Sequence, residues 1–164
     1  MKLPNILIME CDAAVVLILR DDGKFLVIKR ADQKGDPWSG HMALPGGHRD
    51  GDESCEATAV REAQEEVGIT PTNLSYLGIY SPHNREMRVA VFVGYTSSPQ
   101  VKIDGEVDKW FWVDPSELRE ENDHFVYHGY IIWGMTYRIL KDFLSARQRS
   151  SHQVQAVDQS SLKE

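Results

Sequence analysis

Two stretches near the start of the chain are dense in aliphatic and β-branched residues and are separated by a short polar turn. Asp12–Arg20 reads DAAVVLILR and Lys24–Arg30 reads KFLVIKR, with DDG between them. Such a tripeptide between two apolar runs is a typical hairpin turn. The pattern predicts an antiparallel β-hairpin with buried strands, followed by a loop rich in Gly, Asp and Pro over residues 31–41.

The periodicity changes to that of a helix between Glu53 and Val67. This segment has no Gly or Pro and is rich in Ala and Glu, and Gly68, a common helix terminator, follows it. Ala59, Ala63 and Val67 recur at four-residue spacing. We therefore predict an α-helix that packs along a narrow apolar stripe.

Further strands and a second helix are predicted downstream. The strand candidates are Leu74–Ser81, Met87–Tyr95 and Lys109–Val113, and the Asp-Pro-Ser at 114–116 is a typical start of a short helix. From about Gly129 to Arg147, apolar residues repeat on one helical face. Strands surrounding one helix, with another helix at the end, predict an α+β fold in which a mixed sheet lies between helices, an α/β/α sandwich.

The length suits one domain with a sizeable core. The chain has 164 residues, 41% of them hydrophobic, and shows no repeat or internal linker. We expect a single domain over residues 1–147. Residues 148–164 are polar and non-periodic and are expected to form a mobile tail. A homodimer is an open alternative to a monomer.

The net charge and the apolar content of the chain disfavour two kinds of partner, duplex nucleic acid and a membrane. The net charge of −7 disfavours duplex nucleic acid, and no apolar run approaches the roughly 20 residues of a membrane span. The N-terminal apolar stretch is short and ends in acids, unlike a signal peptide. We therefore expect a cytoplasmic protein in which Cys11 and Cys55 are free thiols, with a disulfide as the alternative.

The predicted helix at 53–67 carries a cluster of acids beside its apolar stripe. Glu62, Glu65 and Glu66 lie at neighbouring positions, where like charges repel. A solvated helix face is the ordinary interpretation of such a run. A shared divalent cation would relieve the repulsion, and carboxylate oxygens suit Mg²⁺ or Mn²⁺. An acidic protein could hold a polyphosphate through such a metal.

The residues around these acids form a longer motif. It comprises Gly47, Glu53, Arg61-Glu62-Ala63, Glu65-Glu66 and Gly68-Ile69. At every specified position this spacing resembles the signature of the Nudix hydrolases, and chance would match it on the order of 10⁻⁸ times per window. The resemblance implies a Nudix fold with a loop-helix-loop metal site. It also implies metal-dependent hydrolysis of the phosphoanhydride bond in a nucleoside diphosphate linked to another group.

By matching position, the resemblance assigns roles to individual residues. Arg61 would pair with Glu53, which together with Gly68 would shape the loop-helix-loop. The general base is left open: it would be Glu62 or an acid outside the motif, for which Glu106 is preferred to Glu86 because it lies just before a predicted strand. The implied metal ligands are Gly47, Glu62, Glu65, Glu66 and Glu106, and the implied catalytic residues are Arg61 and these four glutamates.

The residues before the motif resemble the coenzyme A pyrophosphatase subgroup of this family. Leu26-Val27, Arg30, Gly40 and the Leu-Pro-Gly-Gly at 44–47 fit its pattern, as does the Trp-Gly-Met-Thr at 133–136. The chain departs from it where Leu44 replaces Phe, where Ala31 replaces Ser and where a mid-loop Arg is missing. Coenzyme A or a derivative is thus one candidate substrate. ADP-ribose or another nucleoside di- or triphosphate is an alternative, as is a non-catalytic nucleotide-binding regulatory module.

Several residues outside the acids are candidates for contact with such a small-molecule nucleotide. Arg30 suits a bidentate clamp on a diphosphate, or is simply a charge at a strand end. Trp38 could stack on a base or pack in the interior, and Gly46 and Gly47 are assigned to the same substrate site. Trp110, Trp112 and Trp133 are predicted core residues. His41, His48 and His83 are interpreted as loop residues without ligand spacing, although His83 could line the cleft.

Overall fold

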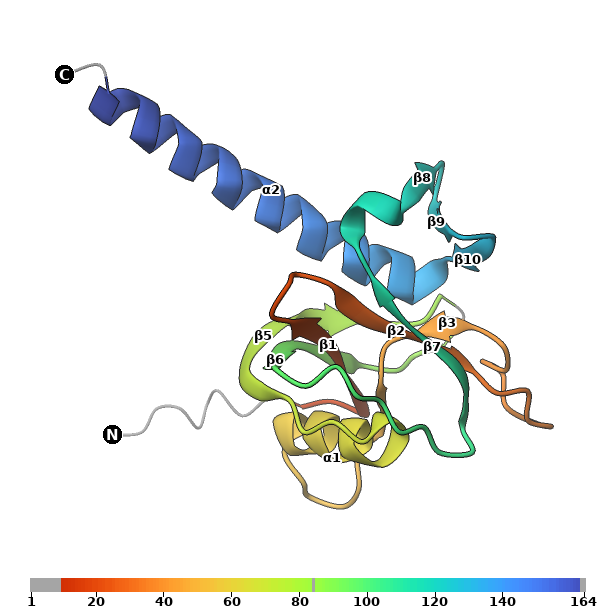
Figure 1. Ribbon diagram of the computed structural model, residues 1–164. Helices are drawn as coiled ribbons and strands as arrows, with labels where there is room; N and C mark the ends of the chain where they lie inside the picture. Colours follow the sequence, from red (N-terminus) through yellow and green to blue (C-terminus); the bar gives the residue numbers. More distant parts are fainter. Residues whose placement is uncertain (1–9, 84, 163–164) are drawn as a thin grey trace, which may run out of the picture.

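The computed structural model describes residues 10–83 and 85–162, with side chains described as far as residue 148. Its centre is a seven-stranded mixed sheet of order β3-β2-β1-β6-β5, in which β4 also pairs with β1 and β7 with β2. Helices α1 (Cys55–Val67) and α2 (Gly134–Leu162) cover opposite faces of this sheet (Figure 1). The strands are β1 (Ala13–Arg20), β2 (Phe25–Arg30), β3 (Met42–Ala43), β4 (Gly46–His48), β5 (Thr72–Tyr80), β6 (Val89–Thr96) and β7 (Val107–Val113).

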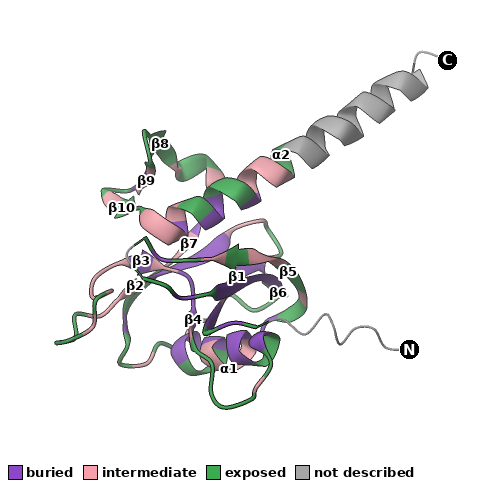
Figure 2. Ribbon diagram, turned by 180° about the vertical axis from the view of Figure 1, so that it is seen from behind, coloured by how far each residue is buried: buried purple, intermediate pink, exposed green. Residues whose placement is uncertain are grey.

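Both faces of the central strands are buried, which explains the continuous apolar runs in the sequence. In β1, Leu17 packs in the core beneath α2, whereas Val16 and Ile18 pack in the core against α1. Successive side chains of a strand point to opposite faces, so one strand supplies both cores. Figure 2 shows the buried residues in the sheet and on the sides of the helices that face it. The predicted α/β/α arrangement is confirmed.

The predicted strands are present with shifts of a few residues at their ends. β1 and β2 form the expected hairpin, with Leu19 opposite Phe25. The three downstream candidates correspond to β5, β6 and β7. β1 also pairs in parallel with β6, from Ala13 opposite Val89 to Arg20 opposite Thr96. This pairing brings together two parts of the chain that are far apart in sequence.

Helix α1 has nearly the predicted bounds. The Ser54 side chain accepts a hydrogen bond from the Ala57 N–H at 3.0 Å and caps its start. Gly68 ends it in the left-handed conformation, with φ of 71°. The predicted apolar stripe is fully buried, since Ala59, Ala63 and Val67 each expose 0% of their surface. Burial of this stripe fixes which side of α1 carries the acids.

The segment before α2 differs from the prediction. β8 (Arg119–Glu121), β9 (His124–Tyr127) and β10 (Tyr130–Ile132) form a separate three-stranded sheet. The predicted short helix is a single 3₁₀ turn, η2 (Pro115–Glu117). The last helix begins five residues later than expected at Gly134, because residues 130–132 pair with β9.

Helix α2 also continues beyond its predicted end at Arg147, as far as Leu162. Beyond residue 147 the sequence is mostly polar, so no hydrophobic periodicity predicts a helix there. The backbone is helical nevertheless. The mobility expected of residues 148–164 stays a prediction. Among the described residues, neither helix has the length and hydropathy needed to cross a membrane.

The start of α2 is held against both sheets by polar contacts. The Tyr80 hydroxyl on β5 donates to Asp142 at 2.7 Å. On the other side, Tyr137 and Lys141 both donate to the Glu120 carboxylate on β8, at 2.6 and 2.7 Å. These contacts, together with the buried Ile139 and Leu140, fix where the first turn of α2 lies.

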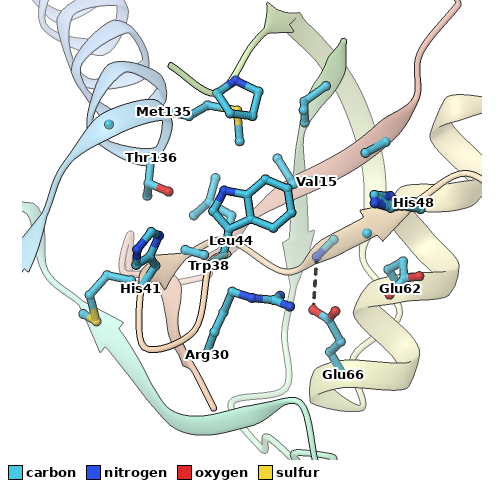
Figure 3. A pocket seen from close by; sticks show the side chains of 18 of the residues that line it. Val15, Arg30, Trp38, His41, Leu44, His48, Glu62, Glu66, Met135 and Thr136 are labelled. Carbon is cyan, nitrogen blue, oxygen red and sulfur yellow. Dashed lines mark hydrogen bonds between the residues drawn. The ribbon is translucent and has the colours of Figure 1, made fainter. Parts of the chain in front are cut away.

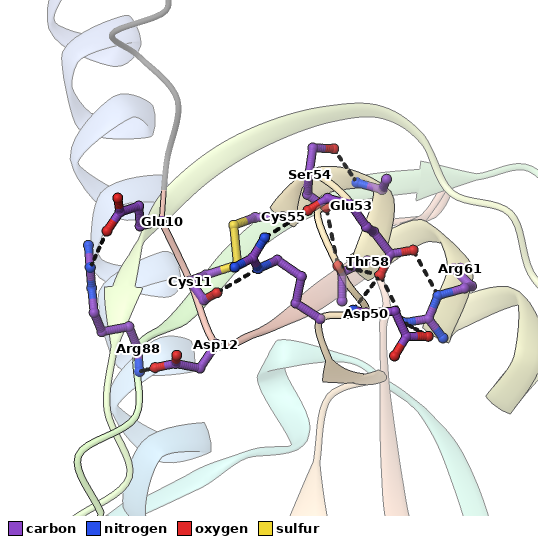
Figure 4. The surroundings of a disulfide bond; sticks show 12 residues. Glu10, Cys11, Asp12, Asp50, Glu53, Ser54, Cys55, Thr58, Arg61 and Arg88 are labelled. Carbon is purple, nitrogen blue, oxygen red and sulfur yellow. Dashed lines mark hydrogen bonds and ion pairs between the residues drawn. A yellow bond between two sulfur atoms is a disulfide. The ribbon is translucent and has the colours of Figure 1, made fainter.

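The two cysteines form a disulfide, so the interpretation as free thiols is wrong. Cys11 and Cys55 are bonded through their Sγ atoms, with Cα atoms 6.2 Å apart. They are 44 positions apart in sequence, and only the fold places the residue before β1 beside the first residue of α1. Arg49 reinforces this contact, because its Nε donates to the Cys11 carbonyl at 2.9 Å (Figure 4). The start of α1 is therefore fastened to the sheet.

Loss of this cross-link should weaken the fold. Cys11→Ser is expected to lower the free energy of unfolding by about 2–4 kcal/mol, because the unfolded chain regains the entropy of a long closed loop. Urea unfolding of the wild type and the variant measures the difference. Full reduction of the wild type before unfolding serves as the control and should bring the two proteins close together. Equal stability without reductant would contradict the expectation.

Candidate active site

A cavity of about 320 Å³ is lined by side chains of the central sheet, of α1 and of the first turn of α2 (Figure 3). Most of the predicted site residues border it: Arg30, Trp38, Gly46, Gly47, Glu62, Glu65, Glu66 and Glu106. Arg61, Glu53 and Gly68 lie behind this lining, and neither Glu86 nor His83 is part of it. The fold thus brings together segments that are separate in sequence.

The backbone of β4 passes unusually close to the acids of α1. The buried Glu66 accepts a hydrogen bond from the Gly46 N–H at 3.1 Å. A Cβ atom on Gly47 would lie 2.5 Å from the carboxyl carbon of Glu62, and one on Gly46 would lie 2.3 Å from the Ala14 carbonyl oxygen. A side chain at position 46 would clash with the backbone of β1, and one at position 47 would displace the Glu62 carboxylate, so both positions favour glycine.

Arg61 binds the loop before α1 and the acids of α1 at once. Its Nε and Nη2 donate to the two carboxylate oxygens of Glu53, at 2.9 and 3.0 Å. Its Nη1 donates to Glu62 at 3.0 Å and to Glu65 at 3.2 Å. The pairing with Glu53 that the resemblance implied is therefore present (Figure 4). A two-pronged contact of this kind fixes the orientation of the carboxylate.

The electrostatics of Glu53 and Glu66 differ sharply. Hydrogen bonds from Arg61, followed by those from Asp50 and Thr58, lower the pKa of Glu53 to about 2. Burial, followed by the nearby charges of Glu62 and Glu106, raises the pKa of Glu66 to about 9, against the opposing effect of the Gly46 N–H. Burial likewise raises the pKa of Glu62. The Glu53 carboxylate is thus held ionised, while negative charge on Glu62 and on Glu66 is disfavoured.

The end of the cavity beside α1, which Glu62, Glu65 and Glu66 line and which is here called the α1 end, offers oxygen ligands suited to a hard divalent cation. Carboxylate oxygens converge there with the Gly47 backbone. Burial, more than the neighbouring acids, raises the pKa of Glu62 and of Glu66, and a bound cation would favour their ionised forms. Among the described residues, no three acidic, histidine or cysteine side chains are already arranged as metal ligands. Arg61 instead binds Glu62 and Glu65, and Gly46 binds Glu66. The metal roles assigned to these residues stay predictions.

Arg30 lies near the same end, with an unsatisfied donor. Its Nη2 donates to Asp36 at 3.2 Å, whereas its Nε is buried and has no acceptor among the described residues. Figure 3 shows the guanidinium extending toward Glu66. An unmade buried hydrogen bond costs about 1–3 kcal/mol. A phosphate oxygen in the cavity would satisfy it, which favours phosphate binding over a simple strand-end charge.

The α2 end of the cavity contains residues that the sequence assigned elsewhere. Trp133, a predicted core residue, is 50% exposed, and its ring meets that of His41 at 4.9 Å between centroids. Both residues border the cavity, as does His48. Trp110 is also exposed rather than core. The positions of His41 and Trp133 depend on the loop before β3 and on the place where α2 begins, which no local pattern indicates.

Trp38 has one of the two roles that its sequence left open, packing, and its stacking on a base stays a prediction. It packs against the core, and it also borders the cavity, where Figure 3 shows it centrally. The Arg85 guanidinium lies over its ring, 4.9 Å from the centroid.

Comparison with known proteins gives the family. The profile of the NUDIX domain matches residues 9–133, most of the chain. The chain belongs to the NUDIX family. Both the family and the fold predicted from the sequence are confirmed.

The names of two relatives of this Nudix chain refer to different substrates, ADP-ribose and coenzyme A. It is 44% identical over 75 residues to an ADP-ribose pyrophosphatase of Methanocaldococcus jannaschii, covering 46% of this chain and 43% of that protein. It is 33% identical over 128 residues to the peroxisomal coenzyme A diphosphatase ndx-8 of Caenorhabditis elegans, covering 70% of this chain and 53% of that protein. The chain thus spans about half the length of these two curated relatives.

A solved structure shows the same fold. The NUDIX domain of Shewanella oneidensis NrtR, crystallised with ADP ribose, aligns with a TM-score of 0.63 at 18% identity. The alignment covers 89% of this Nudix chain and 92% of that one. At this identity the likeness concerns the arrangement of strands and helices alone.

Glu66 should make this Nudix fold less stable as pH rises. Its pKa is 4.5 ordinarily and about 9 in the fold. Between these values the folded state keeps a proton that the unfolded state releases, so the free energy of unfolding decreases with pH. With chelator present, Glu66→Gln should therefore gain at least about 1 kcal/mol over the wild type between pH 5 and pH 8.

Urea unfolding at the two pH values measures this gain. Glu56→Gln is the matched control, because Glu56 is an exposed acid in the first turn of the same helix. It removes one negative charge from α1 without touching the cavity. A Glu66→Gln gain that is the same at both pH values would show that the carboxyl is ionised throughout.

Proposed function

We propose that this chain hydrolyses the phosphoanhydride bond of a nucleoside diphosphate linked to another group, with Mg²⁺ or Mn²⁺ bound at the α1 end of the cavity. The observation that supports this most is the convergence of four glutamates with the unpaired Nε of Arg30 in one cavity of a Nudix chain. Negative oxygens that need a cation lie beside a cationic donor that needs an anion. A metal-bound diphosphate satisfies both.

The residues at the α1 end of the cavity have different roles in this proposal. A divalent cation held there supplies neutralisation of phosphate oxygens and a bound water of lowered pKa. Glu65, Glu66 and the Gly47 carbonyl would hold it together with Glu62, and Arg61 orients two of these carboxylates. Arg30 would donate its Nε to a phosphate oxygen.

Glu106 is the preferred general base. It borders the cavity, is exposed to solvent, and its carboxylate has no hydrogen-bond partner among the described residues. It can therefore accept a proton from an attacking water without first breaking a contact. Glu62, the alternative, is already engaged by Arg61 at 3.0 Å.

Coenzyme A or a derivative and ADP-ribose are the two leading substrates. Both classes appear in the names of relatives of this chain, and each carries a diphosphate joined to adenosine. The apolar lining between the two ends suits a group less polar than a phosphate: Ala13, Val15, Met42, Leu44, Met87 and Val89.

Location and assembly stay predictions. The disulfide between Cys11 and Cys55 bears on the first, because such bonds persist chiefly in oxidising surroundings and are rare in the cytosol. It weakens the argument for a cytoplasmic protein, which rested partly on free thiols. A homodimer stays the open alternative to a monomer.

Turnover of a substrate panel tests the proposal. With Mg²⁺, at least one of coenzyme A, acetyl-coenzyme A, ADP-ribose, NADH, diadenosine polyphosphates and oxidised dGTP should be hydrolysed. Glu66→Gln should lower kcat by about 100-fold or more, since even indirect partners of a metal contribute 10–100-fold. Glu56→Gln, outside the cavity, should keep the wild-type rate.

Release of products is followed by chromatography, and folding by the unfolding midpoint of each variant. Equal activity of the wild type and Glu66→Gln would contradict the role of Glu66. Nucleotide binding without turnover of any panel member would replace the hydrolase with a non-catalytic nucleotide-binding module.

A further inference from the structure

The α2 end of the cavity contains a largely buried threonine whose hydroxyl group has no partner among the described residues. Thr136 exposes only 7% of its surface and borders the cavity, and no described residue forms a hydrogen bond with its side chain. Figure 3 shows this side chain pointing into the cavity near His41. The other buried threonine, Thr58, is satisfied by Glu53 and by the Ser54 carbonyl. The Thr136 hydroxyl therefore needs to break no contact within the protein before it binds a ligand.

Thr136 also belongs to the first turn of a long helix. The first amide groups of a helix have no acceptor within it. In α1, Ser54 caps this end, but α2 follows Trp133, whose indole cannot accept a hydrogen bond. Gly134 and Met135 border the cavity beside Thr136. The positive end of the α2 dipole and its amide donors are therefore presented to the cavity.

The two ends of the cavity differ in charge. Its acidic lining residues gather at the α1 end, where Glu62 and Glu106 raise the pKa of Glu66. Within the described part of the chain, no carboxylate borders the cavity at the α2 end, where His41, Trp133 and Thr136 lie. At the first end the four glutamates outnumber the one guanidinium, that of Arg30, so an anionic group is disfavoured there without a metal ion. At the second end no lining carboxylate opposes it.

We propose that the α2 end binds a phosphate monoester of the substrate, separate from the diphosphate that is hydrolysed at the α1 end. The Thr136 hydroxyl donates to one phosphate oxygen, and the first amides of α2 donate to others. The proposal rests on the hydrolase function proposed above and narrows its substrate class. The preferred substrates are nucleoside diphosphate derivatives that carry an additional phosphate on the nucleoside.

Equilibrium binding tests this without turnover. The probes are adenosine 3′,5′-bisphosphate and adenosine 5′-monophosphate, titrated calorimetrically into the full chain in the presence of chelator. The wild type should bind the bisphosphate about ten-fold more tightly, equivalent to roughly one good hydrogen-bonded contact. Thr136→Val has nearly the same shape and should reduce this advantage to less than about three-fold. Thr136→Ser keeps the hydroxyl and should retain it.

Equal affinity of the wild type for the two probes would overturn the proposal. So would an undiminished advantage in Thr136→Val with an unchanged unfolding midpoint. Thr136→Ala provides a second test if the valine variant does not fold. Hydrolysis of coenzyme A and dephospho-coenzyme A at equal rates, together with equal binding of the probes, would reject the phosphate site and leave the hydrolase function standing. Absence of all turnover would reject the hydrolase and leave the binding result intact.

Discussion

The ion pairs of Arg61 are the interaction on which the arrangement of the acidic end depends. One guanidinium contacts Glu53 in the loop before α1 and two glutamates on the helix itself. Without it, carboxylates crowded on one turn would repel one another and turn toward solvent. With it, the loop, the helix and the passing backbone of β4 form one unit. The two glycines of β4 complete this unit, because a side chain at Gly47 would displace Glu62 and one at Gly46 would clash with β1.

The crowding of these acids makes the fold less stable, although the same acids are the proposed metal ligands. Burying Glu66 beside other acids costs free energy that a well-packed apolar residue would not cost. The structure tolerates this cost because the sheet and α1 are held together elsewhere, by two continuous cores and by a disulfide at the helix start. The acids are thus held in place by packing and by a cross-link rather than by favourable contacts with one another.

The sequence predicted those parts of the fold and site that depend on local patterns. The hairpin, the bounds of α1 and its buried stripe follow from period, turn residues and caps, and the acids follow from a motif whose spacing is that of one helix. The disulfide, the small sheet of β8, β9 and β10, and the position of Trp133 depend on which distant segments meet. Trp133 was misplaced because an aromatic residue before a helix has the same pattern whether it faces the core or a cavity. His41 and Thr136 are candidates for ligand contact because the fold places the loop before β3 and the start of α2 at the same cavity.

The parallel pairing of β1 with β6 affects the order in which the helix and the cavity form during folding. The hairpin and α1 involve contacts between near neighbours in sequence and can form quickly, whereas β1 and β6 must close a long loop before they meet. Val15 and Val89, which form part of the cavity floor, come from these two strands. A chain emerging during synthesis can therefore form its acidic helix well before the cavity exists.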